Sequence, residues 1–152
     1  MSADRQPADP AYEARVRSSF AAQRLMDTLG ARLARVAPGE VDVEMDFREE
    51  LTQQHGYVHA GAITSVVDSA CGYAAATLMP ADAEVLSVEF KVNLLAPAAG
   101  ESFIARARVV RAGRTLTVCQ GDAWARHDGR ERHVATMVAT MIRVPRDPSP
   151  DR

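Results

Sequence analysis

The chain has 152 residues, of which 47% are hydrophobic and 25% are charged, and its formal net charge is -2. This length and composition are typical of one soluble globular domain with a sizeable core, and they exclude a disordered or fibrous chain. The near balance of charge gives no reason to expect nucleic acid or an acidic membrane as a partner. Two cysteines are too few and too far apart for a disulfide framework or a Cys-based zinc site, so a reduced, cytoplasmic location is expected.

Both ends of the chain are expected to be disordered tails. Residues 1–10 contain two prolines, and residues 145–152 are rich in proline and charge. Such segments cannot bury enough apolar surface to become ordered. No linker or internal repeat divides the rest, so residues 11–144 are predicted to form a single domain.

The first elements predicted are a helix and a hairpin. In residues 11–29 apolar residues recur at near-helical spacing, and Gly30 follows as a C-terminal cap, which predicts one surface helix. The segments "RLARV", "PGE" and "VDVEMDF" then predict a hairpin. Its second strand alternates between charged residues and an inward-facing apolar set: Val41, Val43, Met45 and Phe47.

A long apolar run follows at residues 60–79, and Asp68 is its only charged residue. The run is long enough to span a bilayer, but an Asp at the bilayer centre costs about 2.5–3.5 kcal/mol. A buried helix of a soluble domain, ending near Pro80, is therefore preferred.

Four strands, joined largely by short turns, are predicted after the helix, over residues 84–95, 101–111, 115–125 and 132–144. The last of them is apolar on both faces, which predicts that it lies within the sheet and is covered on both sides. Segregated strands after a helix favour an α+β fold, in which an antiparallel sheet wraps around the central helix.

The predicted start of this helix is a candidate site for a negatively charged oxygen. Gly56 and Gly61 flank His59 there, and the first backbone N–H groups, near Ala60 and Gly61, have no acceptor within the helix. Glycine on either side allows a ligand to approach the main chain closely. The alternative is that the glycines only form a turn.

Asp68 is the second candidate functional group. A carboxylate among apolar groups must be paired, hydrogen-bonded or protonated, either for a catalytic role or as a buried Asp tied to a neighbouring hydroxyl or amide. Ala60 and Asp68 are eight residues apart, which on one helix is about 12 Å. One carbonyl group cannot contact both in one chain. If the two act together, a symmetric dimer must supply Asp68 from the second subunit.

The pattern Gln53, Gly56, His59-Ala60-Gly61, Asp68 and Gly72 resembles the active-site segment of PaaI-type hotdog-fold acyl-CoA thioesterases. The segments "SVEFKVNLLAPAAGE" and "VVRAGRTLTV" are also similar to strands of that family, so the resemblance covers residues 30–143. It implies a hotdog fold, with an antiparallel sheet of about six strands around a long central helix, and hydrolysis of an acyl or arylacyl thioester to free acid and CoA.

The resemblance also implies roles for individual residues. The Ala60 N–H would polarise the thioester carbonyl, and Asp68 of the partner chain would act as nucleophile or as general base on water. Gln53 would lie near the thioester, and Ser87 would position the water or the carboxylate. His59 and Gly61 would form the helix entrance, with His59 holding it through its ring hydrogen bonds.

Substrate contacts and partners complete the expectation. Tyr57 and Val58 would line the acyl pocket at the dimer interface, and Arg111 and Arg114, at a strand turn, could meet the phosphates of CoA. The resemblance implies no metal and no cofactor besides the CoA of the substrate. It implies a homodimer with shared active sites that pairs into a tetramer.

Three other readings stay open. The same pocket could serve a non-catalytic acyl-CoA-binding module. A hotdog dehydratase or hydratase is less favoured, because the short motif with Asp and His that such hydratases carry is not found. His55 and His59 have the spacing of a zinc pair on a helix, but Gly56 follows His55 where that motif needs Glu.

Overall fold

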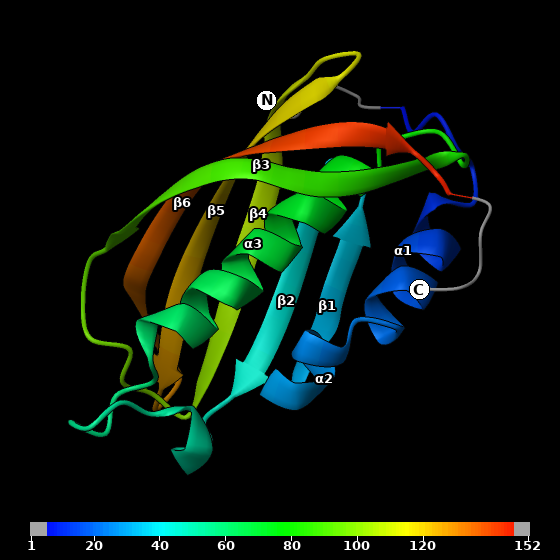
Figure 1. The fold of residues 1–152 in the computed structure, drawn as a ribbon. Coiled ribbons are helices and arrows are strands. Elements are labelled where there is room, and N and C mark those ends of the chain that lie inside the picture. Colours follow the sequence, from blue (N-terminus) through cyan, green and yellow to red (C-terminus); the bar gives the residue numbers. More distant parts are fainter. Residues whose placement is uncertain (1–5, 148–152) are drawn as a thin grey trace.

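Six antiparallel strands form one sheet, in the order β1-β2-β4-β5-β6-β3, in the computed structural model, which describes residues 6–147 (Figure 1). The strands are β1 (Ala31–Ala37), β2 (Glu40–Asp46), β3 (Ala83–Leu94), β4 (Ser102–Ala112), β5 (Leu116–His127) and β6 (Arg130–Pro145). In the sheet β3 pairs with β6, so it is separated from β2 and β4, the strands that precede and follow it in the chain.

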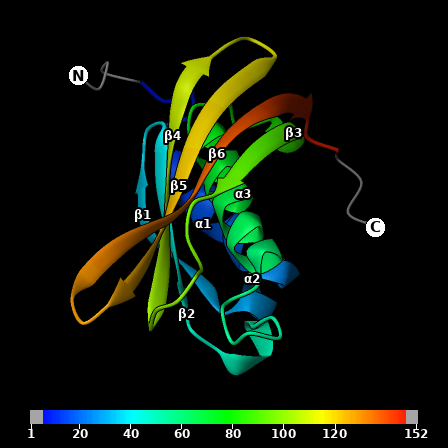
Figure 2. The same ribbon diagram turned by 90° about the vertical axis from the view of Figure 1, so that its left-hand side faces the viewer.

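The long helix α3 (Ala60–Ala76) lies against one face of this sheet and contacts β2, β3, β4, β5 and β6. Two short helices, α1 (Tyr12–Ala21) and α2 (Arg24–Leu29), lie on the same side, next to β1 and α3 (Figure 2). A 3-10 turn, η1 (Glu49–Leu51), precedes the loop that leads into α3. The arrangement is the predicted α+β fold, in which the sheet wraps around a central helix.

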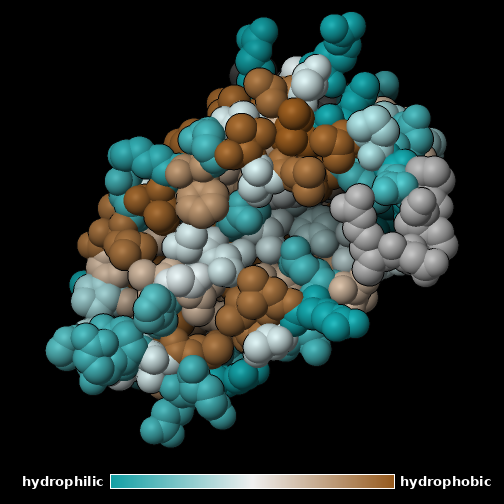
Figure 3. Space-filling view, viewed as in Figure 1, coloured by the Kyte–Doolittle hydropathy of each residue, from teal (hydrophilic) through white to brown (hydrophobic). Residues whose placement is uncertain are grey.

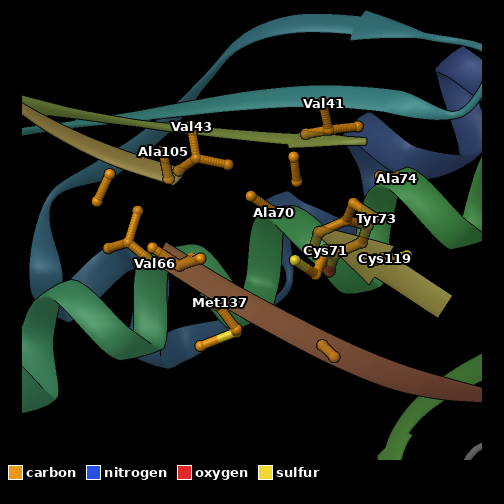
Figure 4. Close-up of a cluster of buried hydrophobic side chains, with 14 of the residues drawn as sticks. Val41, Val43, Val66, Ala70, Cys71, Tyr73, Ala74, Ala105, Cys119 and Met137 are labelled. Atoms are coloured by element: carbon orange, nitrogen blue, oxygen red, sulfur yellow. The ribbon is translucent and has the colours of Figure 1, made fainter. Parts of the chain in front are cut away.

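The core is formed where the inward face of the sheet meets α3 (Figure 4). Val41, Val43 and Met45 are fully buried, as the alternation of β2 predicts. At Gly121 of β5, an added Cβ would lie 2.6 Å from Val67 Cγ1 of α3, so glycine lets helix and strand pack closely. Close-packed contact of this kind fixes α3, and with it the residues at its start and middle.

Four details differ from the sequence-based expectation. The single N-terminal helix is two helices, because Gln23 adopts an extended conformation between them. The side chain of Phe47 is 41% exposed, because β2 ends at Asp46. The helix α3 ends at Ala76 rather than near Pro80. The last strand, β6, lies within the sheet as predicted, but its Val138 is 52% exposed, so one chain covers only one of its faces.

The two expected tails are described only in part. Residues 1–5 and 148–152 lie outside the described residues. Within the first expected tail, Asp9 accepts a hydrogen bond of 2.9 Å from the Arg15 side chain, and in the second, β6 reaches Pro145. Within residues 6–147, none of the helices is long and apolar enough to cross a bilayer.

Candidate active site

The entrance to α3 is held by His59, which is the N-cap residue of the helix. Its ring Nδ1 accepts a hydrogen bond of 2.8 Å from the N–H of Gly61, and its own backbone N–H donates to the carbonyl oxygen of Leu51 at 2.8 Å. An added Cβ at Gly61 would lie 3.0 Å from that ring nitrogen, so glycine makes the close cap possible. The ring therefore serves to cap the helix, as expected for His59.

The N–H of Ala60, at the first position of α3, is left available. No residue that the structure describes accepts a hydrogen bond from it, since the first turn of a helix has no internal acceptor for this group. The positive end of the helix dipole lies at the same place. An oxygen that gains negative charge would be stabilised at Ala60.

Ala60 lines a hollow of about 680 Å³ between the start of α3 and the segment that follows β3. A volume of this size is typical of small-molecule sites. The hollow brings together the predicted residues Gln53, Tyr57, Val58 and His59 with residues that sequence reasoning did not select. The complete lining is Gln53, Gln54, Tyr57, Val58, His59, Ala60, Ile63, Leu94, Leu95, Ala96, Pro97, Ala98 and Val134.

A tight turn places Gln53 in this hollow. The N–H of Gln53 donates to the carbonyl oxygen of Tyr57 at 2.9 Å, and the N–H of Gly56 donates to the carbonyl oxygen of Gln53 at 2.9 Å. Gly56 has a φ of 81°, a conformation that favours glycine. The side-chain oxygen of Gln53 accepts a hydrogen bond from the backbone N–H of His55. The turn thus fixes the position of the Gln53 amide beside Ala60.

Asp68 lies in the middle of α3 and is partly buried. Ser87 of β3 donates a hydrogen bond of 2.8 Å from its Oγ to Asp68 Oδ1. The register of β3 against β6 shifts between Ser87 and Glu89, which marks a bulge next to this contact. The two residues line a second hollow, of about 320 Å³. Its walls also include Ser19, Ala22, Gln23, Ser69, Gly72, Tyr73, Glu84, Val85, Leu86 and Met141.

The two groups that the sequence indicated as functional, the Ala60 N–H and the Asp68 carboxylate, lie at different hollows of one chain. Ala60 lines the larger hollow and Asp68 the smaller one, with no residue shared between the two linings. Their separation of eight residues along the straight helix corresponds to about 12 Å. The structure of the single chain therefore brings Gln53 and His59 to Ala60, and Ser87 to Asp68, but it does not bring Ala60 to Asp68.

An apolar surface lies along β3, the strand that carries Ser87 (Figure 3). The strand β3 is at the edge of the sheet, and large apolar side chains are 42–57% exposed along it: Leu86, Val88, Phe90 and Leu94. Gly72 of α3, one turn after Asp68, has no atom within 4 Å of the position of an added Cβ. Exposed apolar patches and unpaired strand edges are typical of surfaces that bind another chain.

A protein-family comparison matches residues 55–131 to the thioesterase superfamily. The chain belongs to this superfamily. The matched part spans the entrance of α3, Asp68 and Ser87, so it contains most of the residues described above. The expected resemblance to PaaI-type hotdog thioesterases is confirmed.

Solved structures share the fold. A thioesterase family protein from Silicibacter pomeroyi is 54% identical, covers 88% of this chain and 98% of its own, and superposes with a TM-score of 0.87. The PaaI protein of E. coli is 18% identical, with 90% and 96% coverage and a TM-score of 0.79. Among curated relatives, human acyl-coenzyme A thioesterase 13 is 30% identical over 99 residues, or 64% of this chain and 70% of its own. The fold is therefore the hotdog fold, and the chain is a thioesterase-family enzyme.

The two arginines that were expected to bind the phosphates of CoA lie at the turn between β4 and β5. Arg111 is exposed at the end of β4, and Arg114 follows in the turn. Arg114 lines a hollow of about 350 Å³ together with Arg143 and Asp82, near the C-terminal end of α3. Arg114 of the turn and Arg143 of β6 therefore lie at one site, which Arg111 does not line.

Sequence reasoning missed the contribution of the N-terminal helices to the Asp68 hollow. Ser69 Oγ donates a hydrogen bond of 3.1 Å to Gln23 Oε1, and Ser19 Oγ lies 3.2 Å from the hydroxyl of Tyr73. Burial raises the pKa of Tyr73, so its hydroxyl stays protonated. The only local signal was the position of Ser69 and Tyr73 one turn apart on α3, on the face next to Asp68.

The spacing of His55 and His59 left a zinc pair open. The Nδ1 of His59 is occupied by the cap hydrogen bond to Gly61. Within residues 6–147, no group of three or more His, Cys, Asp or Glu side chains is arranged to hold a metal ion.

Proposed function

We propose that the protein is an acyl-CoA thioesterase whose active site is shared between the two subunits of a symmetric dimer. Ala60 of one subunit and Asp68 of the other would act on the same thioester. The observation that carries the proposal is the pairing of an available N–H at Ala60 with a Ser87-bound carboxylate at Asp68, each beside its own hollow. A two-fold axis that joins the two hollows produces two complete sites.

The Ala60 N–H would bind the carbonyl oxygen of the thioester. This oxygen gains negative charge as the carbonyl carbon becomes tetrahedral, so a fixed donor at a helix N-terminus stabilises the transition state more than the substrate. The cap formed by His59 and Gly61 fixes the direction of the first helical turn. Gln53, at the same hollow, would orient the group that is attacked.

Asp68 of the partner subunit would supply the attacking oxygen. As a general base it would take a proton from water, whose oxygen adds to the carbonyl carbon, and the thiolate of CoA would then leave with the electron pair of the C–S bond. As a nucleophile its own oxygen would add first and expel the thiolate of CoA, which leaves with the electron pair of the C–S bond, and water would then hydrolyse the resulting anhydride. In both routes the hydrogen bond from Ser87 holds Oδ1, which leaves Oδ2 to react.

The surface of the chain supports this dimer. Two α3 helices that run antiparallel across a two-fold axis would place Asp68 of each near Ala60 of the other. The helix face that carries Asp68 also carries Gly61, Ser65 and Gly72, small residues that allow close approach. The exposed apolar side chains of β3 would be buried beside it, which favours association. Dimers of this kind would pair further into a tetramer.

In the proposed complex, Tyr57 and Val58 contact the substrate beside Ala60. Arg111, exposed at the end of β4, and Arg114, in the turn that follows, contact the phosphates of CoA. Arginine side chains bind phosphate oxygens through charge-assisted hydrogen bonds. No metal or additional cofactor takes part in the proposed reaction.

The test is hydrolysis of a series of acyl-CoAs by the purified protein and by Asp68→Asn. The wild type is expected to release free CoA, and Asp68→Asn to lose at least about a hundredfold in turnover, because the amide can neither accept the proton nor attack. Asp128→Asn, in an exposed turn remote from the site, is the matched control. Unchanged turnover in Asp68→Asn would contradict the role of Asp68, and tight binding without hydrolysis of any acyl-CoA would indicate a binding module.

A further inference from the structure

We propose that the acyl group of the substrate is an unsubstituted hydrocarbon that lies in the hollow beside Ala60, whereas the coenzyme arm crosses the hollow beside Asp68 of the partner subunit. Gln23 then binds the coenzyme arm. This inference rests on the proposed shared site and assigns a direction to the substrate within it. We call the hollow lined by Ala60 the acyl hollow and the hollow lined by Asp68 the coenzyme hollow.

The acyl hollow is suited to a hydrocarbon. Ile63 and Val134 line it from the core, and the end of β3 and the segment after it supply Leu94, Leu95, Ala96, Pro97 and Ala98. Its polar side chains, such as Gln53 and His59, come from the loop at the helix entrance, next to Ala60, where the thioester itself lies. A hydroxyl or carboxylate carried deeper into this hollow would lose its water without gaining a partner.

The coenzyme hollow is smaller and more polar. Gln23 and Ser69 form one hydrogen-bonded pair on its wall, and Ser19 and Tyr73 form a second. Because Gln23 Oε1 accepts from Ser69, the amide Nε2 is left as a donor, and no described residue accepts a hydrogen bond from it. The extended backbone of Gln23, between α1 and α2, brings this side chain to α3.

This difference in polarity decides the direction of the substrate. The arm of CoA contains two amides, and each loses hydrogen bonds to water when it enters the protein. The coenzyme hollow can replace them through Gln23 Nε2 and through the one hydroxyl proton that the hydrogen-bonded pair of Ser19 and Tyr73 leaves available. The acyl hollow offers no such donors beyond its mouth. A hydrocarbon placed in the coenzyme hollow would instead cover polar groups and leave them without partners.

The position of the arginines supports the same direction. Three hollows follow one another along the C-terminal half of α3 and the start of β3. The coenzyme hollow shares Ser19, Ala22, Tyr73, Glu84 and Val85 with a hollow of about 570 Å³, which also contains Arg15 and Arg146. That hollow shares Ala83 with the one that contains Arg114 and Arg143. Arg15 and Arg146 are paired with Asp9 and Glu84, so Arg114 and Arg143 are the cations that this path offers to the phosphates of CoA. No arginine or lysine lines the acyl hollow.

The first arm of the experiment tests Gln23. We measure hydrolysis of acyl-CoAs from butyryl to palmitoyl, and inhibition by free CoA, which carries the coenzyme arm without an acyl group. Gln23→Ala is expected to raise the inhibition constant of free CoA and the KM for every chain length by a similar factor of about five, because one hydrogen bond is lost. Thr28→Ala, on the exposed side of α2, is the matched control and is expected to change neither.

The second arm tests the acyl hollow. In the wild type, kcat/KM is expected to rise about fourfold for each methylene group until the hollow is full. Ala96→Phe, which adds a ring to the wall of the hollow at a partly exposed position, is expected to shift the optimum to shorter chains. Its inhibition by free CoA is expected to equal that of the wild type.

The reverse pattern would overturn the proposed direction: a change of chain-length optimum in Gln23→Ala with unchanged inhibition by CoA, or weaker inhibition by CoA in Ala96→Phe. The absence of any effect in both variants would also overturn it, since neither hollow would then bind the substrate. These failures are distinct from failure of the proposed function, which is judged by the loss of activity in Asp68→Asn alone.

Discussion

Ser87 and Asp68 are joined by a hydrogen bond of 2.8 Å that links the edge strand β3 to the middle of α3. The residues are 19 positions apart in the chain, and the bond directs one oxygen of the carboxylate toward the strand. The other oxygen is then free to face the hollow. The contact therefore makes Asp68 an oriented group in a hollow rather than an isolated charge in an apolar helix.

Removing this hydrogen bond is expected to lower turnover. Ser87→Ala keeps the carboxylate but not its orientation, and loss of a hydrogen bond to a charged group corresponds to about 10- to 100-fold in kcat. Ser87→Thr, which keeps the hydroxyl, is the control. The melting temperature is expected to stay unchanged, because Ser87 is exposed. If kcat of Ser87→Ala equals that of the wild type, the hydrogen bond has no part in catalysis.

Ala60→Pro removes the proposed carbonyl-binding donor and little else. Proline is well accepted at the first position of a helix, and His59, with φ -59° and ψ 138°, already has the extended conformation that a following proline requires. Because the Ala60 N–H has no acceptor in the described chain, its loss breaks no internal hydrogen bond. We expect a decrease in kcat of about 10²–10³-fold with an unchanged melting temperature. Ala60→Ser, which retains the N–H, should remain active, and full activity of Ala60→Pro would exclude this donor.

The exposed apolar side chains of β3 are expected to hold the dimer together. Phe90→Asp places a charge on a side chain that is 42% exposed in the single chain and would be buried in the dimer. Size-exclusion chromatography with light scattering should show a shift toward monomers, together with loss of hydrolysis. The control is Val110→Asp on β4, at a side chain that is 49% exposed. A dimeric, active Phe90→Asp would show that β3 lies outside the interface.

Glu131 on β6 is expected to make the free energy of unfolding depend on pH in the acid range. The side chains of Arg106 and Arg126 lower the pKa of Glu131 to about 2, from 4.5. A lowered pKa in the folded state means that the ionised group stabilises the fold above pH 4.5, and that this contribution is lost as pH falls toward 2.

Glu131→Gln should therefore lower the free energy of unfolding at pH 7. The difference from the wild type should shrink below pH 4.5, as measured by urea unfolding at a series of pH values. About a third of the side chain is exposed, so solvent screening keeps the effect small. A difference that stays constant from pH 7 to pH 2 would rule out this origin.

The alternation of Val41, Val43 and Met45 predicted a half-buried strand, and the lone Asp68 predicted the functional side of α3. Both are local patterns. The structure confirms the strand and shows Asp68 bonded to Ser87, whereas the functional role of Asp68 stays a prediction. The resemblance of the segment around His59 to hotdog thioesterases then predicted the fold, because that segment occupies one fixed place at the entrance of the central helix.

Other features depend on contacts that no local pattern contains. The apolar repeat continues at near-helical spacing on both sides of Gln23, yet the chain turns there, and Gln23 reaches Ser69, 46 residues away in the chain. Phe47 continues the alternation of β2, but the ladder to β4 ends at the pair Asp46 and Ser102. Val138 is apolar, but its side chain is exposed in the single chain, so only contact with another chain would bury it.

If each active site takes Ala60 from one subunit and Asp68 from the other, two inactive variants should complement each other in a mixed dimer. Ala60→Pro and Asp68→Asn are co-expressed with different affinity tags, and the mixed dimers are purified through both. Each mixed dimer would contain one site with both defects and one site with neither.

We predict that the purified mixed dimers have about half the activity of the wild type per dimer, while each parent variant alone is nearly inactive. Mixed dimers that are no more active than the two parent variants would show that Ala60 and Asp68 do not meet across a subunit interface.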